Sequence, residues 1–456
     1  MHQVDSMSPQ ERRASVSLAL VFAFRMLGLF MVLPVLATYG QQLEGATPLL
    51  IGMAIGAYGL TQAFLQIPFG MLSDRVGRKP VIVVGLLLFA AGGLLAAGAD
   101  NIQQVIAGRI LQGAGAIAAA VMALVADSTR EQHRTKAMAM IGMSIGLAFA
   151  VAMVAGPVVA RLAGLGGVFM STSVLALVGI ALVLLVVPTP QQTQRHRDAG
   201  IVGGALWPAI SNPELLRLNY GIACLHAILM ATFLAIPLAL AREAGLPKEE
   251  HWWVYLAALL LSFFGMVPFI IYAERQRQMK RVLLGAVALL ALVQPLFWLT
   301  EHSLPWLVTC IILFFVGFNL LEATLPSLLS KIAPAGGKGT AMGVYSTSQF
   351  AGAALGGMFG GWLFAHFGLG GVFVGCGLLA LSWLAIGVTM REPPYVTSYR
   401  LAVSPERVQD AGLAASLLAV AGVTDVVIVA DEAAAYLKVD SKLLDREALD
   451  RVAAPV

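Results

Sequence analysis

The sequence carries little charge. Asp, Glu, Lys and Arg together make up only 12% of the 456 residues, whereas 59% are hydrophobic and the mean hydropathy is +0.83. A water-soluble domain could not hide that much apolar surface, so the composition excludes an ordinary soluble protein. The formal net charge of +4 is also too small to indicate a nucleic-acid partner. Lipid is therefore predicted to surround most of the chain.

Cysteine is scarce too. Cys224, Cys310 and Cys376 all lie in apolar runs without metal-ligand spacing, which excludes a disulfide framework or a zinc site and predicts small packing residues. The chain contains no nucleophile elbow, metal-ligand cluster or nucleotide fingerprint, so neither an enzyme nor a bound metal or cofactor is predicted. Since no ATP-binding loop is present, a proton or other ion gradient is the expected energy source.

Long apolar runs are what the sequence has in abundance. A bilayer core of about 30 Å needs roughly 20 apolar residues per helix. Twelve such runs are predicted to be transmembrane helices: 16–39, 49–72, 80–98, 103–126, 136–160, 167–187, 217–240, 252–273, 281–299, 304–330, 339–365 and 369–390.

Basic residues occupy every other connection between these runs. The rich connections hold Arg12 and Arg13; Arg75, Arg78 and Lys79; Arg130, Arg134 and Lys136; Arg195 and Arg197; Arg275, Arg277, Lys280 and Arg281; Lys331 and Lys338; and Arg391. By the positive-inside rule this side is cytoplasmic, which predicts a multi-pass inner-membrane protein with both termini in the cytosol. The first run lacks a small-residue cleavage site and is expected to be retained.

The chain contains an internal duplication. Pro68-Phe69 recurs as Pro268-Phe269, and the segment 164–169 recurs with the identical sequence as 368–373. Two halves of six helices are therefore indicated, with a substrate site near the membrane midplane between them. The predicted divisions are an N-terminal half (1–190), a polar linker with an interfacial helix around Trp207 (191–216), a C-terminal half (217–392) and a soluble domain (395–456).

The connection between the second and third runs reads Gly70-Met-Leu-Ser-Asp74-Arg75-Val-Gly77-Arg78-Lys79-Pro80 and resembles the signature loop of the major facilitator superfamily. Asp127 ends the fourth run at the negative pole of its helix, where a cation is favoured, and Arg78 is the expected partner. The resemblance implies that Asp74 lies by the start of the eleventh helix, near Lys338, and latches the halves together in the outward-open state. Alternatively, these charges only fix topology.

Two further segments resemble motifs of the same superfamily. Arg109-Ile-Leu-Gln112 is similar to its second motif, which implies a role for Arg109 in proton coupling; snorkelling to the nearby surface is the alternative. Gly142, Gly146 and Gly156-Pro157 resemble the antiporter motif of the fifth helix, with the first two glycines four residues apart. Glycines at such intervals also let helices pack closely, whatever the function.

Few ionisable groups lie inside the predicted spans. Arg25 lies close to the midplane of the first, His226 lies in the seventh, and Glu322 is the only acid deep within a span. Because an unpaired carboxylate is costly in hydrocarbon, Glu322 is the first candidate proton carrier and His226 the second. The alternatives are a permanent Glu322–Arg25 ion pair and a neutral, hydrogen-bonded histidine. Polar residues predicted to line a substrate cavity, or else to bond helix to helix, are Arg25, Gln62, Gln66, Gln112, Asn219, Asn319 and Gln349.

The C-terminal extension has a different pattern. Strands are predicted at 399–403, 423–430 and 434–439, and helices at 405–421 and 442–452, an order that resembles a ferredoxin-like α+β domain without its last strand. Residues 399–456 contain no Cys or His, so no thiolate metal site is predicted there. Self-association through the free strand edge, small-ligand sensing and folding support for the bundle remain alternatives.

Residues 10–392 resemble the major facilitator superfamily throughout, and the segment 25–34 together with the C-terminal extension is most similar to the bacterial YajR-type drug/proton antiporters. The resemblance implies proton-coupled efflux of small organic or drug-like compounds, amphipathic or cationic, by alternating access. Proton-coupled nutrient uptake is one alternative. The other is a membrane ligand sensor that signals through the C-terminal domain.

Overall fold

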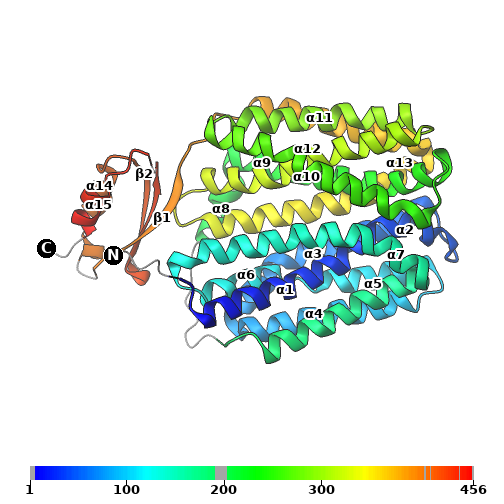
Figure 1. The fold of residues 1–456 in the computed structure, drawn as a ribbon. Helices are drawn as coiled ribbons and strands as arrows, with labels where there is room; N and C mark the ends of the chain where they lie inside the picture. Colours follow the sequence, from blue (N-terminus) through cyan, green and yellow to red (C-terminus); the bar gives the residue numbers. More distant parts are fainter. Residues whose placement is uncertain (1–5, 190–202, 405–406, 411, 441, 454–456) are drawn as a thin grey trace.

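The computed structural model describes residues 6–189, 203–404, 407–410, 412–440 and 442–453. Ten helical segments in this part of the chain are long and apolar enough to cross a membrane. Two of them, α7 (Glu131–Leu185) and α13 (Lys338–Val388), have 55 and 51 residues, more than twice what one span needs. Each turns back on itself at a glycine, so the bundle has the twelve spans expected from the sequence (Figure 1).

The two turning glycines lie at equivalent positions of the sequence duplication. Gly164 has φ 67° and ψ −169°, and Gly368 has φ 66° and ψ −160°. Only glycine adopts this backbone region readily, because a side chain would clash there. The repeated segments 164–169 and 368–373 therefore make the same tight reversal in each half.

The remaining spans are single helices or helices with one break. They are α1 (Pro9–Met31) continued by α2 (Leu33–Tyr39), α3 (Pro48–Val76), α4 (Arg78–Ala97), α5 (Ile102–Ala114) continued by α6 (Ala118–Asp127), α9 (Pro213–Leu238), α10 (His251–Arg275), α11 (Met279–Thr300) and α12 (Leu304–Ile332). Side-chain caps fix several starts, among them Ser8 for α1 and Asn101 for α5. The short α8 (Gly203–Ser211) is the helix expected around Trp207, whereas residues 191–202 of the predicted linker lie outside the described part.

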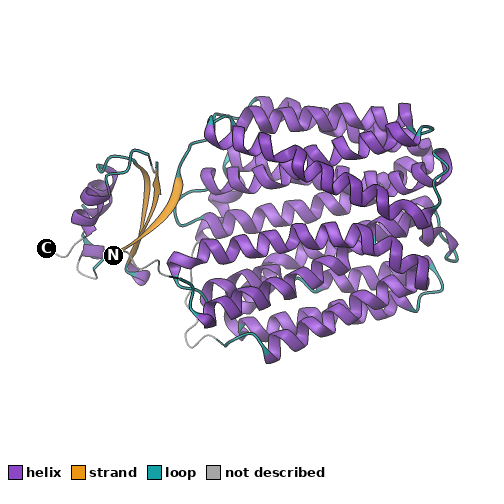
Figure 2. Cartoon of the chain, in the orientation of Figure 1, coloured by secondary structure: helices purple, strands orange, loops and turns teal. Residues whose placement is uncertain are grey.

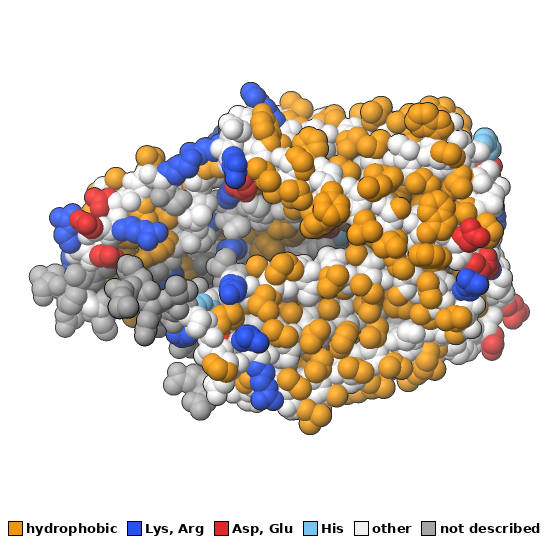
Figure 3. Space-filling model, in the orientation of Figure 1, with side chains coloured by type: hydrophobic (Ala, Val, Ile, Leu, Met, Phe, Trp, Pro, Cys, Tyr) orange, Lys and Arg blue, Asp and Glu red, His pale blue; other side chains and the backbone are white. Residues whose placement is uncertain are grey.

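The soluble domain lies beyond one end of the bundle, and both chain termini are on that side (Figure 1). We call this the domain end and the opposite one the distal end. A belt of hydrophobic side chains covers the flank of the bundle, with basic residues gathered at the domain end and acidic residues at the distal end (Figure 3). Between the two halves the same view shows a hollow that opens towards the domain end.

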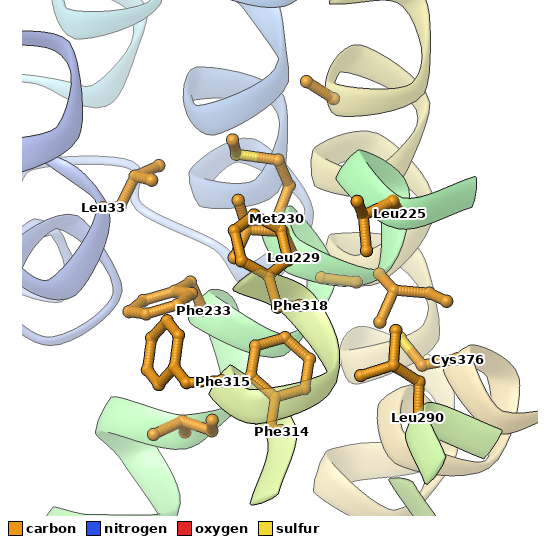
Figure 4. Close-up of a cluster of buried hydrophobic side chains, with 14 of the residues drawn as sticks. Leu33, Leu225, Leu229, Met230, Phe233, Leu290, Phe314, Phe315, Phe318 and Cys376 are labelled. Carbon is orange, nitrogen blue, oxygen red and sulfur yellow. The ribbon is translucent and has the colours of Figure 1, made fainter. Parts of the chain in front are cut away.

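The halves close on each other towards the distal end. There α3 meets the first limb of α13 through glycines: a Cβ added to Gly52 would lie 2.3 Å from the Gly357 carbonyl oxygen. Phe149 of α7 packs against Phe315 and Phe318 of α12, with ring centroids 5.9 and 6.1 Å apart. Figure 4 shows these α12 rings in a buried apolar core with residues of α9. The structure is thus closed distally and hollow at the domain end.

The predicted packing role of the cysteines is confirmed. Cys224, Cys310 and Cys376 are free and buried, and Cys376 lies in the core drawn in Figure 4.

The soluble domain has the predicted βαββα order. Strands β1 (Thr397–Ala402), β2 (Val423–Val429) and β3 (Ala434–Val439) form an antiparallel sheet in the order β1-β3-β2, with α14 (Leu413–Leu418) and α15 (Arg446–Ala453) beside it (Figure 2). The long helix predicted at 405–421 is wrong. The chain forms a short 3₁₀ turn at Arg407–Gln409, and the Asp410 carboxylate then accepts the Gly412 N–H, which starts a turn in place of a continuous helix.

The domain rests on the connection between α12 and α13. Lys438 is buried and its ammonium donates to the Ser330 carbonyl at 2.6 Å. The Asp425 carboxylate accepts the Ala335 N–H at 2.9 Å, and Tyr436 packs against Gly336. The domain is therefore held by polar bonds to the backbone of the C-terminal half.

Candidate functional site

The two proton-carrier candidates from the sequence lie in contact. His226 of α9 and Glu322 of α12 approach to 3.0 Å between Nε2 and Oε1, and Gln349 of α13 lies 2.8 Å from the same histidine nitrogen. The Glu322 side chain is 32% exposed while His226 is only 9% exposed, so the carboxylate faces open space and the imidazole lies behind it. Three helices of the C-terminal half thus converge on one titratable cluster.

The protonation of His226 decides which contact is a hydrogen bond. With a proton on Nε2, the ring donates to Glu322 and Gln349 must turn its carbonyl oxygen towards the ring. Without that proton, Nε2 accepts from the Gln349 amide and loses its bond to the carboxylate. The cluster therefore has two hydrogen-bonding arrangements, which differ in whether Nε2 carries a proton, and either the tautomer or the charge of the ring can set this.

Tyr345 is a neighbour of this cluster that the sequence did not single out. It lies one turn before Gln349 on α13, is 3% exposed, and its hydroxyl has no partner among the described residues. The i, i+4 spacing to Gln349 was the available signal, because it places both side chains on one face of the helix.

The expected alternative of a Glu322–Arg25 ion pair is not formed. Arg25 is 0% exposed, and its Nη2 donates to the Tyr58 hydroxyl at 2.6 Å and to Gln62 at 2.8 Å. Gln62 in turn donates to Gln66 at 2.7 Å. These polar side chains, predicted to line a cavity or to bond helix to helix, form a buried chain of hydrogen bonds between α1 and α3.

Arg109 lies on the other side of the same tyrosine. It is 1% exposed, which rules out snorkelling to the surface in this conformation. Its Nη1 donates to Gln112 at 3.1 Å, and Gln112 donates to Thr172 at 3.0 Å. The guanidinium carbons of Arg109 and Arg25 lie 4.9 and 5.8 Å from the Tyr58 ring centroid. Tyr58, which the sequence did not single out, is therefore the centre of the polar core of the N-terminal half.

The two asparagines on the predicted cavity faces have different surroundings. Asn319 donates to the Ser262 hydroxyl at 3.0 Å, so it bonds α12 to α10. Asn219 is 6% exposed, and its carbonyl oxygen has no partner in the part of the chain that the structure describes.

The predicted Arg78–Asp127 contact is present, with 3.4 Å between Nε and Oδ2. Arg78 also pairs with Asp74 and donates to Ser73 at 2.7 Å. Asp74 is thus bound within its own half, and not to the start of α13, which agrees with a hollow open at the domain end.

The rest of the signature loop is shaped by glycine and capped by lysine. Gly77, with φ 108°, joins α3 to α4, and the Gly70 carbonyl accepts the Ser73 hydroxyl at 2.7 Å. The Lys79 ammonium donates to the Val187 carbonyl at 2.6 Å, whereas Arg75 is exposed. The loop therefore binds the segment that directly follows α7 as well as α6.

The glycines of the α7 motif behave differently from each other. A Cβ on Gly156 would lie 2.5 Å from the Met31 carbonyl oxygen, so this glycine, followed by Pro157, permits close packing where α1 gives way to α2. Gly146 has nothing within 4 Å of such a Cβ, so the close-packing interpretation is wrong for this residue in this conformation. Gly146 is exposed, so no neighbouring helix covers this face of α7 in the part of the chain that the structure describes.

Two polar contacts join the halves at the distal end, and the sequence did not reveal either. Arg242 donates to Gln41, and the Lys248 ammonium lies 4.0 Å from the Tyr39 ring centroid. Each pairs a residue near the seventh or eighth span with one at the end of the first. They add electrostatic attraction to the glycine contacts that close this end.

Comparison with known proteins places this geometry in a wider group. The chain matches the family model described as Major Facilitator Superfamily over residues 18–357 and again over 221–421. It also matches the YajR YAM domain over residues 399–454.

Relatives match over most of the chain. The inner membrane transport protein YajR of Escherichia coli K12 is 53% identical over 96% of this chain and 97% of its own. The multidrug resistance protein MdtH of Aeromonas salmonicida is 26% identical over 75% of this chain and 84% of its own. Among solved structures, the nucleoside transporter NupG superposes with a TM-score of 0.65 at 13% identity, covering 83% of this chain and 99% of that one, which shows a shared fold.

Proposed function

The chain belongs to the major facilitator superfamily, and from this premise we propose that it exports small organic compounds in exchange for protons by alternating access. The observation that carries the proposal is the contact of 3.0 Å between His226 and Glu322 beside the hollow. The match to MdtH, whose name describes multidrug resistance, supports efflux as the direction.

In this proposal the proton resides on the His226–Glu322 pair. A carboxylate exposed to the hollow can exchange protons with water, and the imidazole behind it can pass a proton on through its ring nitrogens. Protonation neutralises Glu322 and lowers the cost of enclosing it in a closed, low-dielectric cavity. Substrate binding and deprotonation are then coupled because both change the charge of the same cavity wall. Arg109, which lies in the N-terminal half, is proposed to contribute to proton coupling from the other side of the cavity.

The latch residues and the distal contacts set the two conformations. In the structure the distal end is closed and Asp74 is held by Arg78. In the opposite state, we propose, the distal glycine contacts separate and Asp74 reaches the start of α13, where the positive pole of that helix favours a carboxylate. The domain end is then the cytoplasmic end, which the basic residues gathered there support.

The test is proton movement in proteoliposomes that trap a pH-sensitive dye. Compounds of cationic, neutral and anionic classes are added outside at equal pH. Antiport raises the internal pH, because protons leave as substrate enters, whereas symport lowers it. Glu322→Gln is expected to abolish either signal, and Glu44→Gln, which removes an exposed carboxylate at the distal end, is the matched control.

Each outcome separates the candidate functions. A fall in internal pH would replace export by proton-coupled uptake. Binding of a compound without any flux in the parent protein would favour a ligand sensor that signals through the docked C-terminal domain. Normal flux in Glu322→Gln would remove the proposed proton carrier.

For the soluble C-terminal domain itself we propose self-association through the outer edge of β1, to be checked by sedimentation of the full chain.

A further inference from the structure

A buried hydroxyl beside the titratable cluster has no partner. Tyr345 of α13 is only 3% exposed, and its hydroxyl forms no hydrogen bond with any residue that the structure describes. Buried polar groups nearly always find a partner, because an unpaired one keeps the full cost of its desolvation. Tyr345 therefore has a donor to spare in the interior of the C-terminal half.

The spare donor lies next to the carboxylate of the cluster. Tyr345 shares a face of α13 with Gln349, whose amide lies 2.8 Å from His226. Glu322 is the ionisable group whose charge acts on the Tyr345 hydroxyl. Its Oε1 lies 3.0 Å from His226, whereas its Oε2 has no hydrogen bond within the described part of the chain. The carboxylate thus has room for a second donor.

The two arrangements of the cluster differ in how well they serve this carboxylate. With a proton on Nε2, His226 donates to Glu322. Without that proton, Nε2 accepts from Gln349, and the carboxylate loses its donor. An ionised carboxylate in a partly enclosed cavity is costly when nothing donates to it. A tyrosine hydroxyl can turn its hydrogen towards a new acceptor and forms a strong bond with an ionised one.

We propose that Tyr345 is a positioning residue of the proton site, whose hydroxyl donates to the Glu322 carboxylate when Nε2 of His226 carries no proton. Tyr345 and His226 then replace each other as donors, so the ionised carboxylate has a partner in both arrangements. That the cluster carries the coupled proton rests on the proposed function, but the hydrogen bond itself requires only the folded protein.

Few other ionisable groups approach this region from the helices packed against α12 and α13. These are α3, α8, α9, α10 and α11, while β1 belongs to the soluble domain. Inside the spans, α9 supplies His226, α10 supplies Tyr255, and α3 supplies Tyr58, whose hydroxyl already accepts from Arg25. Tyr220 of α9 bonds the second limb of α13 instead. The charged residues and histidines described near the ends of these helices and limbs are Asp74, Arg75, Glu214, Arg217, His251, Glu274, Arg275, Lys280, Arg281, Lys331, Lys338 and His366.

The experiment is an infrared titration of the purified full chain in detergent. The carbonyl band of a protonated carboxyl group disappears as the group ionises, and the band of Glu322 is the one that is missing in Glu322→Gln. Loss of a donor to the ionised form lets the carboxyl group keep its proton to higher pH. Tyr345→Phe is therefore expected to move the midpoint of this titration upwards by about one pH unit.

The matched control is Tyr255→Phe. Tyr255 of α10 is 0% exposed, its hydroxyl also has no partner among the described residues, and burial alone acts on it. The same atom is thus removed from an equally buried ring, and the Glu322 midpoint should not move. If Tyr345→Phe does not fold, Tyr345→Leu serves in its place, since it also lacks the hydroxyl.

A double variant tests whether the two donors replace each other. In His226→Phe or Tyr345→Phe alone, the remaining donor still serves the carboxylate. The shift of the Glu322 midpoint in the double variant should therefore exceed the sum of the two single shifts. Strictly additive shifts, or a midpoint in Tyr345→Phe equal to that of Tyr255→Phe, would overturn the proposal.

The infrared result does not depend on transport. Proton flux that requires Glu322, together with an unshifted band in Tyr345→Phe, would remove the role of Tyr345 alone. A shifted band in a protein that moves no protons would remove the transport proposal alone.

Discussion

Substitution of Gly56 by leucine is expected to open the distal end. Gly56 of α3 lies against the first limb of α13, and a Cβ there would sit 2.5 Å from the Ala354 carbonyl oxygen. Such a distance is well inside van der Waals contact, and the obstacle is backbone that cannot rotate away. Overpacking of this kind costs about 1–3 kcal/mol. The contact exists only while the halves are closed distally, so the cost falls on that conformation.

A cost of this size should shift the equilibrium towards the distally open state by roughly 5- to 150-fold. Leu234→Cys is a suitable reporter, because Leu234 is 1% exposed and lines a cavity of about 260 Å³ between the halves at this end. The three native cysteines are buried and should contribute little background. The rate of labelling by a membrane-impermeant maleimide then measures how often the distal end opens.

The matched control is Gly285→Leu, since a Cβ at Gly285 would have nothing within 4 Å. Labelling in the control should equal that of the reporter protein alone. An unchanged rate in folded Gly56→Leu protein would refute the reasoning, because it would mean that the α3–α13 contact either repacks without cost or does not control access to the distal end.

Two further predictions concern the ends of the bundle. Burial, with nearby Glu243, raises the pKa of Glu301 in the distal loop, while His302 lowers it, and the net shift is upwards. Because Glu301 ionises less readily in the folded state than in the unfolded state, its ionisation disfavours folding. The stability of the protein should therefore fall as pH rises through the range above the ordinary pKa of a glutamate. Glu301→Gln should unfold at a higher temperature than the parent at pH 8 and at a similar temperature at pH 4, and a parent-like midpoint at pH 8 would contradict this. At the domain end, Lys438→Met leaves the Ser330 carbonyl without its 2.6 Å partner and should speed proteolytic release of the soluble domain. Release is measured by gel, and the control is Lys442→Met, which removes an exposed lysine of the same domain. Equal release rates in the two variants would show that Lys438 does not hold the domain.

The polar groups inside the bundle are divided unequally between its halves. The N-terminal half holds Arg25 and Arg109 around Tyr58, and the C-terminal half holds His226 and Glu322 with Gln349. The buried charges of one half are therefore cationic, whereas the other half holds a carboxylate beside an imidazole. In the function proposed above, only the second half carries the proton.

The sequence by itself determined the features that depend on local order along the chain. Span number follows from the length of apolar runs, and the two halves follow from the repeated segment around Gly164 and Gly368, whose backbone conformation needs glycine. The contact between Arg78 and Asp127 followed from the poles of the helices that carry them. The soluble domain followed from strand alternation, except where Asp410 interrupts the predicted helix.

Only the tertiary structure decided which polar groups meet. Helices surrounded by lipid are apolar on most faces, so no polar stripe in the sequence fixes how each one is rotated about its axis. His226, Glu322 and Gln349 come from three such helices, and Tyr58 joins two arginines from two others. Which of these side chains meet depends on how glycines and aromatic rings pack the helices together. Those packing contacts join residues that are far apart in the chain, so a single sequence does not specify them.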